Sequence, residues 1–101
     1  MRLLAARDES GGHIGAVTDA QILDAYRMLA AQEGVFVEPA SAASVAGLLQ
    51  AAASGLLGTG ETIVCTVTGH GLKDPNRAIA EIEARPPVDA TVDAVVEELG
   101  L

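Results

Sequence analysis

Two short segments combine small residues with polar side chains, a composition typical of ligand-binding loops. They are Glu38-Pro39-Ala40-Ser41 and Thr68-Gly69-His70-Gly71. Each follows a run of β-branched or aromatic residues, so each is expected beyond the carboxyl end of a strand, where open α/β sheets bind ligands. Glycine lets main-chain atoms approach a ligand, and adjacent backbone amides can hold an anion. By spacing alone, the second segment fits an ordinary turn better than a binding loop.

A helix over about residues 19–33 should precede the first segment. Thr18 and Gln21 have the spacing of a capping box, and Gly34 fits the position just after a helix. Apolar residues recur between them at helical spacing, namely Ile22, Leu23, Tyr26, Leu29 and Ala30. Residues 35–37 then predict a short strand.

A second helix and a second strand should follow. Pro39 suits the first turn of a helix, which we expect to run over 39–54, and the glycines of 55–60 predict a turn. Residues 62–67 are almost all β-branched, which indicates a strand buried on both faces, as in a parallel sheet.

The rest of the chain predicts two more helices and a loop. Asp74-Pro75 should open a helix that carries Ala78, Ile79 and Ile82 and ends before Arg85-Pro86-Pro87, and a last helix should cover about 90–99. Residues 1–17 show no sustained periodicity and predict an N-terminal loop or arm. The alternation of helix and strand predicts an α/β fold, with residues 18–101 as a single segment of helices packed on a short parallel sheet.

The charge balance excludes several classes of function. Six basic residues against fourteen acidic ones give a net charge of −8. A nucleic-acid binder or a polybasic membrane-surface protein would need the opposite balance. No apolar run reaches the roughly 18 residues that span a bilayer. The single cysteine, Cys65, rules out an internal disulfide and a cysteine-based zinc site, and it favours a reducing cytoplasm. In mid-strand, its thiol should be buried and inert.

The apolar residues are numerous but small. Half of the chain is hydrophobic, yet only Tyr26 and Phe36 are aromatic. Large aromatic side chains usually supply much of the burial in a small core. The composition therefore suggests a slice of a larger layered protein, or one half of an oligomer.

Taken together, the residues of these segments resemble the C-terminal quarter of the bacterial threonine synthases, which are fold-type-II pyridoxal-phosphate enzymes. Two motifs about 30 residues apart carry the likeness, Glu33-Gly34-Val35-Phe36-Val37-Glu38-Pro39-Ala40-Ser41-Ala42-Ala43-Ser44 and Thr66-Val67-Thr68-Gly69-His70-Gly71-Leu72-Lys73-Asp74-Pro75. It extends from about Arg7 to the C-terminus, and it implies a partial three-layer α/β fold. Related dehydratases share the Glu-Pro element but not Gly-Leu-Lys-Asp-Pro.

The resemblance implies one contact to the cofactor. In that family the threonine before Gly-x-Gly hydrogen-bonds the pyridine nitrogen of pyridoxal phosphate, and Thr68 holds this position. A neutral hydroxyl does not force that nitrogen to stay protonated, as a carboxylate would. The alternative is that Thr68 only ends a strand.

Four further residues are weaker candidates for lining the pocket: Glu38, Ser41, Gly69 and His70. Glu38 fits a surface position before proline equally well, and Ser41 fits helix packing better. His70 is a candidate general base, but a loop histidine bonded to main chain is the better reading. The sequence assigns no catalytic residue and no metal ligand.

The resemblance also defines what the chain lacks. Lys73 is its only lysine, whereas the family's Schiff-base lysine and phosphate loop lie upstream, in a region absent here. The parent reaction would convert O-phosphohomoserine and water to threonine and phosphate. We expect the chain alone to bind no pyridoxal phosphate and to be inactive. Expected partners are the missing N-terminal part of the enzyme and a second copy in a homodimer. Two alternatives are a self-associating interaction module and a small phosphate-ligand binder without catalysis.

Overall fold

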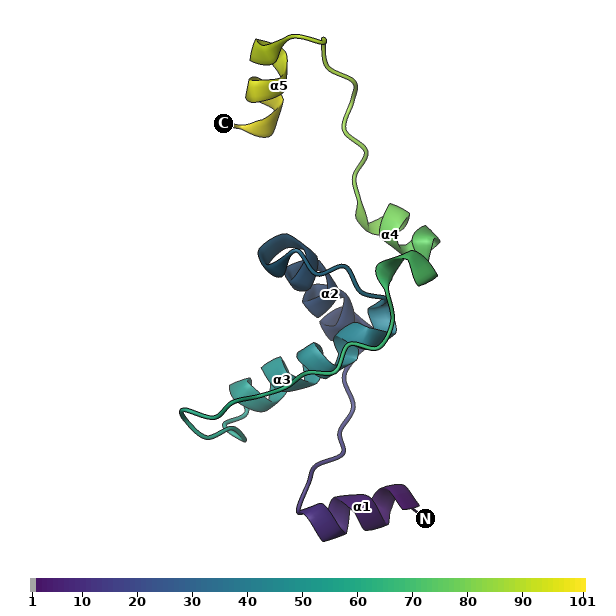
Figure 1. The fold of residues 1–101 in the computed structure, drawn as a ribbon, viewed down its shortest axis with the longest axis vertical. Coiled ribbons are helices and arrows are strands. Elements are labelled where there is room, and N and C mark those ends of the chain that lie inside the picture. Colours follow the sequence, from purple (N-terminus) through teal and green to yellow (C-terminus); the bar gives the residue numbers. More distant parts are fainter. Residues whose placement is uncertain (1) are drawn as a thin grey trace.

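A computed structural model describes residues 2–101, and its core lies around two helices. They are α2 (Asp19–Glu33) and α3 (Ala43–Ala53), joined through the short 3-10 helix η1 (Pro39–Ala42) (Figure 1). The buried side chains come from these elements and from the residue before η1, and they are mostly small: Ala25, Tyr26, Val37, Ala42, Val45 and Ala46. Alanine at the contact lets the helices approach closely, so the core is tight but narrow.

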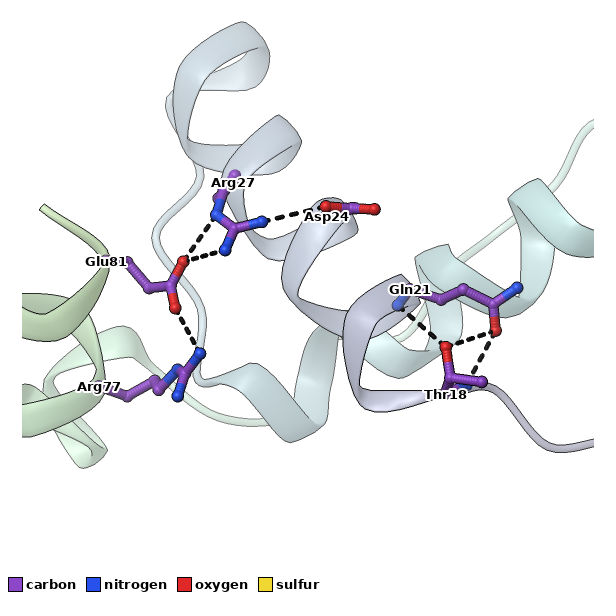
Figure 2. A network of polar contacts seen from close by, with 6 residues as sticks. All are labelled: Thr18, Gln21, Asp24, Arg27, Arg77 and Glu81. Atoms are coloured by element: carbon purple, nitrogen blue, oxygen red, sulfur yellow. Dashed lines mark hydrogen bonds and ion pairs between the residues drawn. The ribbon is translucent and has the colours of Figure 1, made fainter.

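The predicted helix over 19–33 is confirmed, with both of its ends as expected. The Thr18 hydroxyl accepts a hydrogen bond from the Gln21 amide, and the Gln21 side chain accepts one from the Thr18 amide, which completes the capping box (Figure 2). Gly34 adopts a left-handed conformation with φ of 65° and ends the helix. These local signals fix α2 before the chain turns into the candidate segment at Glu38.

The helix predicted over 39–54 is present, but its first turn is of the tighter 3-10 kind. Pro39 occupies the start of η1, and the α-helical hydrogen bonds begin at Ala43. The strand predicted over 35–37 does not form. Val37 instead makes an isolated antiparallel bridge to His70, which is the one β pairing within residues 2–101.

The strand prediction for 62–67 is not confirmed in the described chain, and the expected burial is wrong. This segment runs beside α3 without joining a sheet (Figure 1). Ser44 Oγ donates to the Thr66 carbonyl at 3.1 Å and holds it there. The side chain of Val64 is 84% exposed, because no second strand or helix of the described residues covers it. A parallel strand needs neighbours to pair its backbone and bury its faces.

The helix predicted after Asp74 is confirmed as α4 (Pro75–Glu81), preceded by the 3-10 helix η2 (Gly71–Lys73). The Asp74 carboxylate accepts from the Arg77 amide at 3.2 Å, as an N-cap should. Of the predicted apolar face only Ala78 is buried, and Ile79 and Ile82 are exposed.

An ion bridge ties α4 to α2. Glu81 Oε2 lies 2.5 Å from Arg27 Nη2, and its other oxygen pairs with Arg77 (Figure 2). Arg27 also pairs with Asp24 at 3.0 Å. One carboxylate thus joins two guanidinium groups from helices that are far apart in sequence.

The two ends of the chain extend away from the core. Residues 2–10 form α1 (Arg2–Ser10), so the prediction of a loop over 1–17 is wrong for this part. The physical reason is propensity: Leu, Ala and Arg favour a helix without any buried face, and Gly11 ends it at φ of 66°. The predicted last helix is confirmed as α5 (Val92–Leu99), and neither end helix has a buried residue.

The described chain is therefore long and open. Its extents are 62 × 31 × 19 Å and its radius of gyration is 18.4 Å, against about 13 Å for a compact domain of this length. No helix within residues 2–101 has the length and apolar character to cross a membrane.

Candidate functional site

The two candidate segments meet at the bridge between Val37 and His70. The Glu38 amide donates to the Gly69 carbonyl at 2.9 Å, and the Gly71 amide donates to the Phe36 carbonyl at 3.2 Å. Main-chain hydrogen bonds thus hold residues 36–38 against 69–71. The sequence predicted both segments at the edge of one parallel sheet, and the structure brings them together by antiparallel pairing instead.

Both glycines of the second segment are required by close neighbours. A Cβ atom at Gly69 would overlap the carboxyl group of Glu38, and one at Gly71 would overlap the Phe36 ring. The absence of a side chain is what lets the two segments approach. Phe36 is a residue that the sequence analysis did not single out for the site; its position two residues before Glu38 was the available signal.

Glu38 lies over Gly69 and pairs with Lys73, two residues beyond the second segment. Its Oε2 lies 3.3 Å from Lys73 Nζ. The Lys73 side chain is largely exposed, whereas that of Glu38 is mostly covered. The ion pair therefore joins the segments at their outer side and engages the only lysine of the sequence.

The contact region between residues 36–41 and 68–71 is called the junction, and Ser41 lies at its centre. It is 5% exposed, and its Oγ accepts a hydrogen bond from the Gly69 amide at 2.7 Å. The same oxygen lies 3.3 Å from Thr68 Oγ1. Ser41 is held in turn, because its amide donates to the Glu38 carbonyl at 3.0 Å and its carbonyl accepts from Ser44 Oγ at 3.1 Å.

Thr68 is an exposed residue whose hydroxyl contacts Ser41. A threonine hydroxyl has one proton to donate and two lone pairs to accept with. The junction therefore offers an uncharged hydrogen-bonding group in a defined position.

His70 has a local role in this geometry. Its Nδ1 accepts from the Leu72 amide at 3.1 Å, which caps η2. Its ring packs edge-on against Phe36, with centroids 5.7 Å apart. These contacts agree with the interpretation of His70 as a loop histidine bonded to main chain.

Cys65 is only partly buried. It packs against the core, and its sulfur lies 3.9 Å from the Ser44 carbonyl. Ser44 is a second residue that sequence reasoning missed. It bonds both the Ser41 and the Thr66 carbonyls, a role that small-residue composition did not reveal.

An open groove of about 610 Å³ lies elsewhere, between residues 13–17 and α3. None of the candidate residues lines it; its walls are mainly small residues with His13 and Gln50. Within residues 2–101, no three His, Cys, Asp or Glu side chains gather in a way that would hold a metal ion.

Comparison with known proteins identifies the family. The profile of the family described as "Pyridoxal-phosphate dependent enzyme" matches residues 1–69, more than half of the chain. The chain belongs to this pyridoxal-phosphate dependent enzyme family. The membership agrees with the predicted α/β class, and the family's cofactor is pyridoxal phosphate.

Curated relatives of the chain are threonine synthases, which confirms the resemblance found in the sequence. The chain is 53% identical to the threonine synthase of Mycobacterium leprae over 96 residues, 95% of this chain and 27% of the relative. It is 55% identical to that of Halalkalibacterium halodurans over 82% of this chain and 23% of the relative. For Synechocystis the identity is 60%, over 74% of this chain and 19% of the relative. The chain thus spans about a quarter of the length of these relatives.

The residues of the junction fit one end of the family's cofactor. Pyridoxal phosphate has a ring nitrogen, which calls for a single hydrogen-bonding group, and the hydroxyl of the exposed residue Thr68 is such a group. The buried Ser41 beside it gives this hydroxyl a fixed neighbour. The ammonium group of Lys73 takes no part in this contact, because it pairs with Glu38.

Proposed function

We propose that this chain forms the part of a threonine synthase in which Thr68 hydrogen-bonds the pyridine nitrogen of pyridoxal phosphate. The enzyme would convert O-phosphohomoserine and water to threonine and phosphate, with the cofactor supplying an electron-withdrawing ring. The observation that carries the proposal is the placement of the Thr68 hydroxyl, which belongs to an exposed residue and lies 3.3 Å from the hydroxyl of buried Ser41. Relatives at 53–60% identity supply the choice of reaction.

Glu38, Gly69 and His70 would shape the surroundings of this contact. Glu38 and Gly69 are in close contact, which supports a role in setting the distance between the two segments. His70 would support the loop through its bond to the Leu72 amide, with no part in proton transfer.

The same proposal gives residues 62–67 a place in a parallel sheet. Their β-branched composition and the 84% exposure of Val64 support strands of the remaining enzyme on either side. Residues 18–101 would then be one segment of a three-layer α/β domain, with residues 1–17 as an arm.

Contacts with further polypeptide would also cover the end helices. The apolar side chains of α5 are exposed, which supports burial against the rest of the enzyme and against a second copy in a homodimer. A reducing cytoplasm suits the single cysteine. Nothing in the comparisons supports the two alternatives, a self-associating module and a small phosphate-ligand binder.

A chimeric enzyme tests the proposal. The matching segment of the Mycobacterium leprae threonine synthase is replaced by this chain, and phosphate release from O-phosphohomoserine is measured together with the affinity for pyridoxal phosphate. We expect the chimera to be active. Thr68→Val should weaken cofactor binding by roughly five- to tenfold, because one hydrogen bond is lost.

Thr66→Val is the matched control, since Thr66 lies two residues earlier and outside the contact between Ser41 and Thr68. It should leave both quantities within about twofold of the unsubstituted chimera, because valine keeps the β-branched shape that suits the proposed strand. An active chimera in which Thr68→Val and Thr66→Val behave alike would refute the assigned contact, while a folded chimera without any turnover would refute the reaction.

A further inference from the structure

The hydrogen bonds around Ser41 have a direction that the geometry defines. The hydroxyl of Ser41 has one proton and two lone pairs. One lone pair is used by the Gly69 amide, which can only donate, at 2.7 Å. The proton of Ser41 must then find an acceptor, because the side chain is only 5% exposed and a buried hydroxyl proton is costly to leave unpaired.

That acceptor is Thr68 Oγ1. Within residues 2–101, the Ser41 hydroxyl has two hydrogen-bond partners, the Gly69 amide and, at 3.3 Å, Thr68 Oγ1. If Thr68 donated to Ser41 instead, the buried proton of Ser41 would have no acceptor. The order that satisfies both hydroxyls is therefore Gly69 amide to Ser41, and Ser41 to Thr68.

This order leaves the proton of Thr68 available to an acceptor other than Ser41. A donor in that position suits an acceptor with a lone pair, such as an uncharged aromatic ring nitrogen, and disfavours a protonated one. Consecutive hydrogen bonds that point the same way also polarise one another, which strengthens the last donor.

We propose that Ser41 is a positioning residue that makes the Thr68 hydroxyl a donor to an unprotonated ring nitrogen. This inference rests on the proposed function, because it takes the ring nitrogen to be that of pyridoxal phosphate. It assigns Ser41 a part in setting the protonation of the cofactor, beyond packing the start of η1.

The backbone of Ser41 is held by its neighbours, as the role of a positioning residue requires. The Ser41 amide is bonded to the Glu38 carbonyl and the Ser41 carbonyl to Ser44 Oγ, so the backbone of Ser41 is held from both sides. Gly69 is held by the Glu38 amide. The donor and the acceptor of Ser41 therefore keep their distances without further support.

The test uses the chimeric enzyme loaded with pyridoxal phosphate that carries ¹⁵N in its ring. The chemical shift of this nitrogen reports its protonation directly, independently of turnover. In Ser41→Ala, Thr68 no longer accepts a hydrogen bond from residue 41 and can accept one from a protonated ring nitrogen, so we expect the resonance to move toward that of a protonated ring. Cofactor affinity should fall about fivefold, as for the loss of one neutral hydrogen bond.

Two further variants separate positioning from packing. Ser44→Ala removes a neighbouring hydroxyl that bonds the Ser41 and Thr66 carbonyls and leaves the side-chain bonds of Ser41 in place, so it should move the nitrogen resonance far less than Ser41→Ala does. Ser41→Thr keeps the hydroxyl and should restore the original resonance. In the 101-residue chain without cofactor, the Gly69 amide should exchange with solvent about fivefold faster in Ser41→Ala.

The outcomes distinguish this inference from the proposed function. If Thr68→Val moves the nitrogen resonance while Ser41→Ala leaves it in place, the role of Ser41 is wrong and the Thr68 contact stands. If Thr68→Val leaves the resonance unchanged, the contact itself is wrong, and the role of Ser41 falls with it.

Discussion

Residues 62–67 and residues 68–71 are neighbours in sequence but differ in how they are held. Residues 62–67 are attached to α3 by the hydrogen bond from Ser44 to the Thr66 carbonyl, and Val64 is 84% exposed. The second segment is fixed by two main-chain hydrogen bonds to residues 36–38, by the Ser41 hydroxyl and by the pair between Glu38 and Lys73.

The difference separates the structure that this chain forms by itself from the structure that would need further polypeptide. The junction between 36–41 and 68–71 closes through residues that the chain contains. The segment over 62–67 has the composition of a central strand, but a central strand is defined by its neighbours. The site of the proposed cofactor contact is thus held by local contacts, while the proposed sheet would depend on further polypeptide.

Substitutions in the core and in residues 62–67 should differ most in their effect on the free energy of unfolding. Tyr26 is 5% exposed and is the largest buried side chain of the core. Tyr26→Ala should lower the free energy of unfolding by about 3 kcal/mol, through lost burial and the cavity left behind. Val64→Ala, at an exposed position, should change it by less than about 0.5 kcal/mol. Urea unfolding followed by circular dichroism measures both, and equal losses would contradict the division into a packed and an unpartnered region.

Within the packed region, replacing two glycines by alanine should change the free energy of unfolding in opposite directions. Gly71→Ala should destabilise the chain by about 1–2 kcal/mol, because the Phe36 ring must move and lose its contact with His70. Gly47→Ala, in α3 with no atom near its added Cβ, should stabilise by about 0.5–1 kcal/mol. The same unfolding experiment reads both signs, and a stabilising Gly71→Ala would mean that the two segments are not in close contact.

A smaller effect is expected at the ion bridge between α2 and α4. The side chain of Glu81 is 10% exposed and joins Arg27 to Arg77. Glu81→Gln should cost about 1 kcal/mol, since two charged partners lose their carboxylate. Asp24→Asn, at an exposed partner of Arg27, should cost less than about 0.5 kcal/mol. Amide hydrogen exchange in α4 should rise only for Glu81→Gln; a similar rise in both would show that the bridge does not hold the helix.

The sequence predicted the elements that carry local signals. Thr18, Gln21 and Gly34 defined α2 at both ends, and Asp74 with Pro75 defined the start of α4, because caps act over one turn of the chain. The helix α1 was missed because it has no apolar face to reveal, only residues of high helix propensity.

The arrangement of the site was predictable only in part. The residues of both segments were found from their motifs, but not the antiparallel bridge that joins them. That bridge depends on Gly69 and Gly71 fitting against Glu38 and Phe36, which is a contact over some thirty residues of sequence. The hydrogen bonds of Ser41 were likewise hidden, since sequence alone favoured packing for this residue.

We propose that this chain supplies a cofactor contact at Thr68 but not the lysine that carries the cofactor. The most direct test titrates the purified 101-residue chain with pyridoxal phosphate, followed by visible absorbance, borohydride reduction and intact-mass analysis. We predict no saturable absorbance band and no stoichiometric mass adduct, because the only lysine, Lys73, has a largely exposed side chain and an exposed amine binds an aldehyde only weakly. A stoichiometric adduct on Lys73 with saturable absorbance would contradict the claim.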